Sequence, residues 1–254
     1  MSKSYHKILP KVANQIQLIM TDVDGTLTRE GTSVSSVISK VVSHIQEQGI
    51  TVGLVSGRTL LELESLAIDL GISGPIIAEN GGIAKLKVNS QLVDLGYSRQ
   101  PALEAFKTLR TLFPGAIRER DDNKDRMVDV VIRTYGIEVE ELTRHVENVQ
   151  VLDSGYILHL MQKGVSKGRT LMKLLGELGD GNLSPAEVMV FGDALTDISL
   201  FELFPYSVLV LNPKLPVKHV ELLQKYARYV SDLPFDEGFA EVAAHIINTR
   251  VSKV

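Results

Sequence analysis

The chain has 254 residues, 44% of them hydrophobic and 23% charged, and a formal net charge of −4 at pH 7. This composition is typical of a globular protein with a sizeable core, and it lacks the basic excess of a nucleic-acid-binding protein. The absence of cysteine excludes disulfides, thiolate catalysis and cysteine-ligated metal centres, and it agrees with a cytoplasmic location. Because we find no signal-peptide core and no apolar run of about 20 residues, we expect no membrane partner.

Strands and helices alternate in the first third of the chain. The apolar run at 16–20 predicts a buried strand, and apolar residues at helical spacing predict a helix over 34–48 that stops before Gly49. The alternation continues with a strand at 50–56, a helix at 60–71 and a strand at 75–78. Strands separated by helices in this way favour a parallel sheet covered by helices.

The middle of the chain has a different pattern, with strands that follow one another in pairs. Residues 83–88 and 91–95 flank a turn at Asn89-Ser90, which predicts a hairpin. Beyond it we predict helices at 101–113 and 139–146 and strands at 116–120, 127–133, 149–154 and 156–161. This order is typical of an antiparallel sheet with helices on one face.

The last third returns to the first pattern. We predict helices at 167–178, 197–204, 217–226 and 239–248 and strands at 188–191, 207–211 and 229–231. The simplest architecture is an α/β fold with a Rossmann-like parallel-sheet core made of residues 1–82 and 163–254. Residues 83–162 would be inserted into this core as an α+β cap.

Two carboxylates follow the first predicted strand. Asp22 and Asp24 are two residues apart, so an extended backbone would direct both side chains to one face at the carboxyl end of the sheet. On its own, this pattern also fits a solvated Asp-Gly turn. Three further polar segments lie at predicted strand ends or helix starts of the same sheet: Ser56-Gly57-Arg58, Lys167 and residues 192–197. Because all of them would meet at one edge of the sheet, we interpret them together as one functional site.

Segments of this chain resemble, in the same order, the four motifs of the haloacid dehalogenase (HAD) superfamily of phosphatases: DVDGTLT (22–28), Ser56-Gly57, Lys167 and GDALTD (192–197). The residues Glu79-Asn80-Gly81-Gly82 before an inserted cap resemble the subgroup that includes phosphoglycolate, sucrose-phosphate and mannosylphosphoglycerate phosphatases. The stretches 74–83, 153–168 and 229–239 are most similar to the archaeal-type phosphoglycolate phosphatases.

The resemblance implies a hydrolase of phosphoric monoesters that acts on a small phosphorylated metabolite, with 2-phosphoglycolate as the first candidate. Sugar phosphates such as sucrose 6-phosphate are the alternative substrates. A phosphomutase, which passes the phosphoryl group to a second hydroxyl, is an alternative reaction. A binding module without catalysis would not need the motif aspartates and lysine. The oligomeric state is left open by the sequence.

The resemblance also implies roles in catalysis. It makes Asp22 the nucleophile that forms an aspartyl-phosphate, and Asp24 the acid that protonates the leaving oxygen and then activates water. Ser56, Gly57 and Lys167 would bind the substrate phosphate. An aspartate suits the nucleophile because it is ionised at neutral pH, whereas the acid must have its pKa raised by burial or by neighbouring negative charge.

A magnesium site is implied by the same motifs. Mg²⁺ prefers oxygen ligands, and the resemblance assigns it to Asp22, the backbone carbonyl of Asp24 and Asp193, with Asp197 completing or supporting the metal site. The last motif commonly has asparagine where this chain has Thr196. Because both aspartates of that motif remain, we expect activity, with the arrangement of this loop left open.

The cap offers basic residues for substrate specificity. Arg118, Arg120 and Arg126 cluster around a charged predicted turn, together with Lys124. Such strand faces are usually solvated, but these arginines are the cap's best candidates for reaching a substrate carboxylate. His159 lies in an apolar strand, and we interpret it as a packed or hydrogen-bonded core residue.

Overall fold

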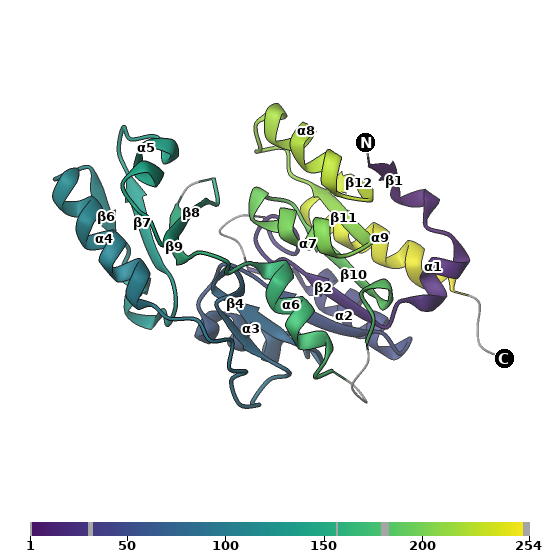
Figure 1. Ribbon diagram of the computed structural model, residues 1–254. Coiled ribbons are helices and arrows are strands. Elements are labelled where there is room, and N and C mark those ends of the chain that lie inside the picture. Colours follow the sequence, from purple (N-terminus) through teal and green to yellow (C-terminus); the bar gives the residue numbers. More distant parts are fainter. Residues whose placement is uncertain (1, 30–32, 156, 179–182, 251–254) are drawn as a thin grey trace.

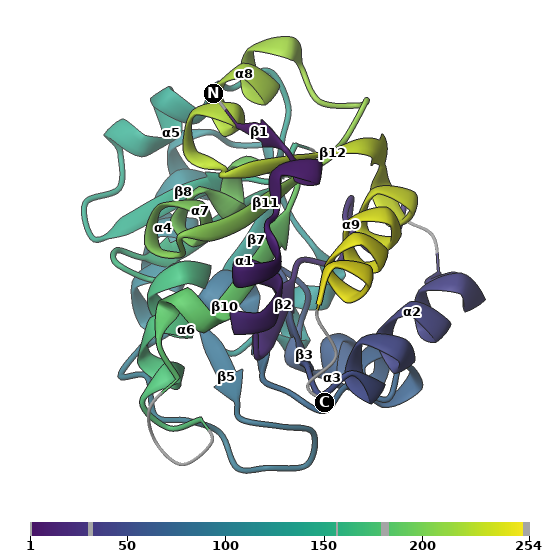
Figure 2. The same cartoon turned by 90° about the vertical axis from the view of Figure 1, so that its right-hand side faces the viewer.

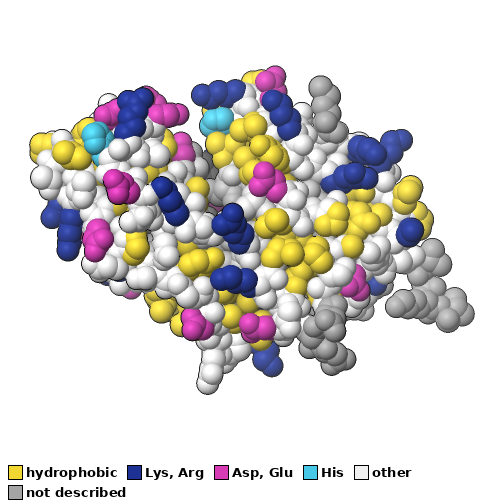
Figure 3. Space-filling view, in the orientation of Figure 1, with side chains coloured by type: hydrophobic (Ala, Val, Ile, Leu, Met, Phe, Trp, Pro, Cys, Tyr) yellow, Lys and Arg dark blue, Asp and Glu magenta, His cyan; other side chains and the backbone are white. Residues whose placement is uncertain are grey.

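The structure is a computed structural model that describes residues 2–29, 33–155, 157–178 and 183–250. Its strands form two separate sheets, which belong to a larger and a smaller unit seen on the right and the left of Figure 1. On the face shown in Figure 3, acidic and basic side chains are interspersed over both units. Among the described helices, none is both long and apolar enough to cross a membrane.

The larger unit is built on a sheet that, within the described residues, has eight strands. From edge to edge they are β1 (Lys3–Ser4), β12 (Tyr229–Pro234), β11 (Tyr206–Leu211), β10 (Val188–Gly192), β2 (Leu18–Thr21), β3 (Thr51–Val55), β4 (Ile76–Ala78) and β5 (Ile83–Lys85). All neighbours are parallel except β4 and β5. Every residue of β2 and β10 is buried, as expected for parallel strands covered on both faces.

Helices cover both faces of this sheet, as Figure 2 shows. One core contains buried residues of α1 (Pro10–Gln15), α2 (Ser36–Glu47), α3 (Leu60–Asp69) and α9 (Phe235–Thr249). The other contains buried residues of α6 (Lys167–Leu175), α7 (Ile198–Leu203) and α8 (Val217–Tyr226). In α2 the helical spacing of Ile38, Val42 and Ile45 buries all three side chains, each worth roughly 1.5–3 kcal/mol.

The smaller unit packs two helices on one face of an antiparallel sheet, as the sequence predicts. The sheet order is β6 (Ile117–Glu119), β7 (Val130–Thr134), β9 (Leu158–Gln162) and β8 (Val149–Asp153). The helices are α4 (Gln100–Leu112) and α5 (Val139–Arg144), and their apolar side chains share a core with Leu158 and Leu160. Since successive residues of a strand point to opposite faces, His159 lies on the face turned away from that core.

Short 3-10 helices connect several of these elements. They are η1 (Tyr5–Lys7), η2 (Glu79–Gly81), η3 (Asp121–Asp125), η4 (Pro185–Glu187) and η5 (Leu195–Asp197). Two of them follow parallel strands of the large sheet: η2 comes directly after β4, and η5 comes shortly after β10. Both therefore lie at the carboxyl-terminal edge of that sheet.

Several predicted elements are corrected by the structure. The predicted hairpin at 83–95 is reduced to β5 and a single bridge between Lys85 and Leu92. We assigned this segment to the cap, but the pairing of β5 with β4 places it in the large sheet. The elements β1 and α1 were not predicted from the sequence. The last helix, α9, begins at Phe235 rather than at the predicted residue 239. Tyr156, predicted to begin a strand, lies outside the described residues.

The two units are joined by a buried carboxylate. Glu79 lies in η2 with a left-handed backbone conformation, φ 49°, which is uncommon for this residue. Its side chain accepts hydrogen bonds from the backbone N–H groups of Met127, Val128 and Asp129 in the smaller unit, at 2.8, 2.8 and 3.0 Å. In return, Arg126 Nη1 donates to the carbonyl oxygen of Gly57 in the larger unit, at 3.0 Å. This segment of the smaller unit is therefore fixed against the loops that follow β3 and β4.

Candidate active site

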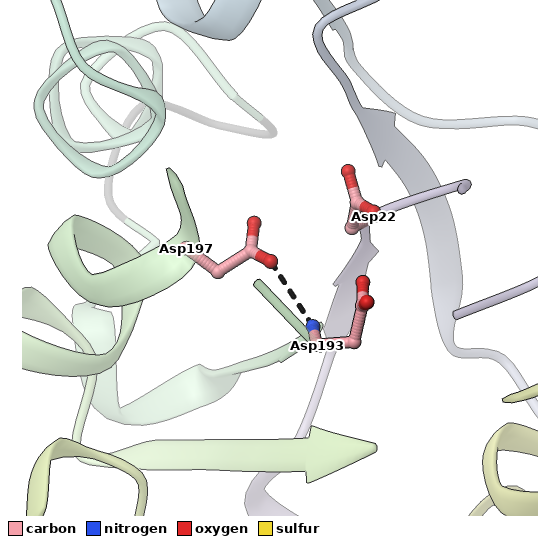
Figure 4. Close-up of side chains that lie close together, drawn as sticks. All are labelled: Asp22, Asp193 and Asp197. Carbon is pink, nitrogen blue, oxygen red and sulfur yellow. Dashed lines mark hydrogen bonds between the residues drawn. The ribbon is translucent and has the colours of Figure 1, made fainter. Parts of the chain in front are cut away.

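Three aspartates meet where the central strands of the large sheet end. Asp22 follows β2, Asp193 follows β10, and Asp197 ends η5. Because β2 and β10 are adjacent and in register, with Thr21 opposite Phe191, the first two side chains emerge next to each other (Figure 4). One ligand oxygen from each of the three carboxylates lies within 4.8 Å of the others, and all three residues are buried. Here the chain leaves β2 for β3 on one side and β10 for β11 on the other, the usual place for a ligand in such a sheet.

Neighbouring groups fix the orientation of Asp193. Its Oδ1 accepts from Thr26 Oγ1 at 3.2 Å, and its Oδ2 accepts from Asn212 Nδ2 at 2.7 Å. The loop after β2 passes so close that a Cβ on Gly25 would lie 2.1 Å from Asp193 Oδ2, and Gly25 has φ +87°. Only glycine allows both this approach and this backbone conformation.

Lys167 neutralises part of the carboxylate cluster. It opens α6 and is 2% exposed. Its Nζ donates to Asp22 Oδ1 and to Asp197 Oδ1, each at 2.7 Å. Burial alone would lower the pKa of Lys167, but the carboxylates of Asp197 and Asp22 raise it above its usual range. The residue is therefore a fixed ammonium at the base of the site.

The carboxylates of the cluster also act on one another. Burial raises the pKa of Asp22 to about 7, against the effect of Lys167 and with a contribution from Asp197. Burial, followed by the charges of Asp22 and Asp197, also raises the pKa of Asp193 well above its usual range. Convergent carboxylate oxygens are the ligands that a hard divalent cation prefers. Asp22, Asp193 and Asp197 therefore fit a magnesium ion by their chemistry and their spacing.

Asp24 is paired with Arg58, which lies in a candidate segment of the sequence analysis but was given no role there. Arg58 Nε donates to Asp24 Oδ2 at 2.8 Å, and Arg58 Nη2 donates to Oδ1 at 2.6 Å. This two-point contact is the preferred geometry of an arginine–carboxylate pair. The position of Arg58 directly after Ser56-Gly57 is the one sequence signal that could have pointed to it.

A cavity of about 590 Å³ lies between the two units and contains this site. Of the predicted site residues in the larger unit, Asp197 is the one that does not line the cavity; it accepts a hydrogen bond from Lys167 instead. The residues that do line it are Asp22, Asp24, Ser56, Gly57, Lys167 and Asp193. Thr196 also lines the cavity. Sequence reasoning therefore located the main groups of the larger unit's wall.

The three cap arginines have different positions. Arg118 lies over the ring of Tyr135, 5.2 Å from its centroid, and is not among the described residues that line the cavity. Arg126 lines it, but its side chain is only 3% exposed and is bound to Asp122, Asp129 and Gly57. Arg120 lines the cavity and pairs with Asp122 through Nε, at 2.8 Å. Of the three, Arg120 is the one whose side chain is open to a ligand, at 31% exposure.

The fold and the site define a protein of the α/β class that places carboxylates and a lysine on the wall of a cavity at the ends of parallel strands. A family model described as haloacid dehalogenase-like hydrolase matches residues 19–123 and 114–242. The chain belongs to this family. The resemblance predicted from the four motifs is thereby confirmed, as are the α/β fold and the expectation of an enzyme.

Curated relatives and solved structures agree with this assignment. A protein named phosphoglycolate phosphatase from Methanoculleus marisnigri is 33% identical over 232 residues, which is 89% of this chain and 94% of that protein. One of the same name from Methanothrix thermoacetophila is 30% identical over 91% of this chain and 97% of its own length. The crystal structure of Thermoplasma acidophilum 0175 has the same fold, with a TM-score of 0.76, 24% identity and coverage of 91% and 98%.

Proposed function

We propose that this chain is a Mg²⁺-dependent phosphatase that hydrolyses 2-phosphoglycolate through an aspartyl-phosphate on Asp22. The family makes it a hydrolase, and relatives that share nearly their whole length with it are named phosphoglycolate phosphatases. The observation that carries the proposal is the buried contact between Lys167 and Asp22 within a cluster of three aspartates on a cavity wall. The cytoplasmic location stays a prediction from the sequence.

Asp22, Asp193 and Asp197 would hold the cation, and the backbone carbonyl of Asp24 would add a ligand. When bound, Mg²⁺ supplies positive charge that reduces the repulsion between the nucleophile and the anionic phosphate. Thr26 and Asn212 keep Asp193 oriented for this role, and the backbone N–H groups of residues 193 and 194 orient Asp197, each at 3.0 Å.

Asp22 would attack the phosphorus of the substrate in line with the leaving oxygen. A bond forms between its carboxylate oxygen and phosphorus as the bond from phosphorus to the ester oxygen breaks. Lys167 contributes a fixed positive charge, and the Ser56 hydroxyl contributes a hydrogen bond to the phosphoryl oxygens. A water molecule then attacks the phosphorus, which releases phosphate and returns Asp22 to its starting form.

Asp24 would donate a proton to the leaving oxygen and take one from the attacking water. Both of its oxygens are held by Arg58 in this structure. A proton transfer therefore requires the guanidinium to release at least one oxygen of Asp24. Arg58 is the group that would hold this carboxylate before the substrate arrives.

A phosphate-release screen over phosphorylated acids and sugars, with and without Mg²⁺, tests the proposal. We expect release from 2-phosphoglycolate with the highest kcat/KM and loss of release after chelation of the metal. A higher kcat/KM on a sugar phosphate would replace the proposed substrate. Formation of a new phosphorylated sugar in place of free phosphate would replace hydrolysis by phosphoryl transfer to a hydroxyl.

A further inference from the structure

The amide nitrogen of Asn80 has no partner in the described part of the chain. Asn80 is 2% exposed, and its Nδ2 is buried without a hydrogen bond. Its backbone is held in place, because its N–H donates to the Ser56 carbonyl at 2.9 Å with φ 53°. An unsatisfied buried donor costs about 1–3 kcal/mol, and native proteins contain few of them. Since Asn80 lines the cavity, a bound ligand is the natural partner of its amide.

A histidine of the cap lines the same cavity. His159 is 2% exposed, and its Nδ1 lies 2.6 Å from Asp129 Oδ2. Burial alone would raise the pKa of Asp129, but His159 and Arg126 hold it below its usual range. An ionised carboxylate can only accept, so His159 Nδ1 is the donor in this pair. The other ring nitrogen, Nε2, is left for a group in the cavity.

Asn80 and His159 converge on one point beside the predicted phosphate loop. A Cβ on Gly57 would lie 3.0 Å from Asn80 Nδ2, 3.1 Å from Asn80 Oδ1 and 3.3 Å from His159 Cε1, the carbon between the two ring nitrogens. Gly57 follows Ser56 directly, so the two side chains lie next to the place where the proposed mechanism binds the phosphoryl group. Glycine at position 57 keeps this space open.

We propose that Asn80 Nδ2 and His159 Nε2 form a subsite that binds the carboxylate of the substrate. Asn80 belongs to the larger unit and His159 to the smaller one. This inference rests on the proposed phosphatase function. It identifies the preferred substrate of the enzyme as a short phosphorylated acid. A carboxylate accepts from two donors, and a histidine ring with a hydrogen on each nitrogen donates to two acceptors. Arg126 and Arg120 already pair with Asp122, and Arg126 also pairs with Asp129. Within the described residues, neither Asn80 Nδ2 nor His159 Nε2 has such a pairing.

The test compares 2-phosphoglycolate with 2-hydroxyethyl phosphate, in which a hydroxymethyl group replaces the carboxylate. The variant Asn80→Asp keeps the size and the tolerance of a positive φ but replaces a donor by a repelling acceptor. His159→Asn keeps a donor for Asp129 and removes Nε2, the ring nitrogen proposed to bind the carboxylate. His159→Gln is the matched control, because its amide reaches the position of Nε2.

We expect Asn80→Asp and His159→Asn to lower kcat/KM for 2-phosphoglycolate ~100-fold. For 2-hydroxyethyl phosphate the same variants should change kcat/KM less than ~3-fold, and His159→Gln should retain most of the preference for the acid. A parallel fall on both substrates would show a structural role and overturn the subsite. An unchanged ratio of the two kcat/KM values would overturn it as well.

Binding separates this inference from the proposed reaction. In an Asp22→Asn background, which cannot form the phosphoenzyme, calorimetry should show tighter binding of 2-phosphoglycolate than of 2-hydroxyethyl phosphate. Adding Asn80→Asp should remove that difference. Selective binding by the Asp22→Asn protein without any turnover by the unmodified protein would contradict the proposed function and keep the subsite. Equal binding of the two compounds would overturn the subsite while leaving phosphatase activity intact.

Discussion

The ammonium of Lys167 lies 2.7 Å from Asp22 Oδ1 and 2.7 Å from Asp197 Oδ1, and all three residues are buried. One lysine thus links the loop after β2, the start of α6 and the loop after β10. These ion pairs affect the stability of the fold as well as the charge of the site. Removing one partner of a buried pair leaves charges without compensation, which is more costly than the pair itself is favourable.

Replacing Lys167 by methionine should therefore destabilise the metal-free protein by about 3–5 kcal/mol. The apolar chain keeps most of the volume but leaves Asp22 and Asp197 unpaired. Denaturant unfolding in the presence of a chelator would measure the loss. Added Mg²⁺ should stabilise the variant more than the unmodified protein, because it then supplies the missing positive charge. Equal stabilisation of both proteins would argue against a shared cation and lysine site.

The Asp22→Asn variant should lose hydrolysis by at least ~1,000-fold, because an amide cannot act as the nucleophile. The substitution keeps the size of the side chain, so the fold should be retained, which circular dichroism can check. Phosphate release measures the activity, and acid quenching of the unmodified enzyme with labelled substrate should trap a phosphoenzyme that the variant lacks. A variant with near-normal turnover would remove Asp22 from the mechanism.

The Asp24→Asn variant should distinguish substrates by their leaving groups. Loss of an acid catalyst typically costs ~100–10,000-fold in rate, and we expect this for 2-phosphoglycolate, whose leaving alkoxide needs a proton. We expect a much smaller loss for p-nitrophenyl phosphate, whose leaving group is stable as an anion. Steady-state rates on both substrates provide the comparison. The same loss on both would indicate that Asp24 does not transfer the proton.

Magnesium affinity should depend on pH because burial raises the pKa of Asp22 to about 7. Below this pH the carboxyl group is protonated and must lose its proton before it can bind the ion. The affinity should therefore fall as the pH is lowered, by up to about tenfold per pH unit below pH 7. Calorimetric titrations in buffers of different ionisation enthalpy would show proton release at pH 6 and little at pH 8. Affinity that does not change over this range would contradict a role for Asp22 as a ligand.

The sequence by itself determined the α/β core and the groups that follow its strands. Apolar runs such as residues 18–21 and the helical spacing of Ile38, Val42 and Ile45 are local patterns, and they specify elements without knowledge of their neighbours. Asp22 and Asp193 could be assigned to one site for the same reason, because each directly follows a parallel strand. The carboxyl ends of such strands meet at one edge of a sheet.

The tertiary structure decided which cap residues and which partners belong to the site. His159 is buried and hydrogen-bonded, as the sequence interpretation expected. Only the packing of Leu158 and Leu160 against α4 and α5 turns it toward the cavity. The pairing of Arg58 with Asp24, and the position of β5 in the large sheet, likewise depend on contacts through space. Periodicity shows that a strand has two faces, whereas the docking of one unit on the other determines which face meets a ligand.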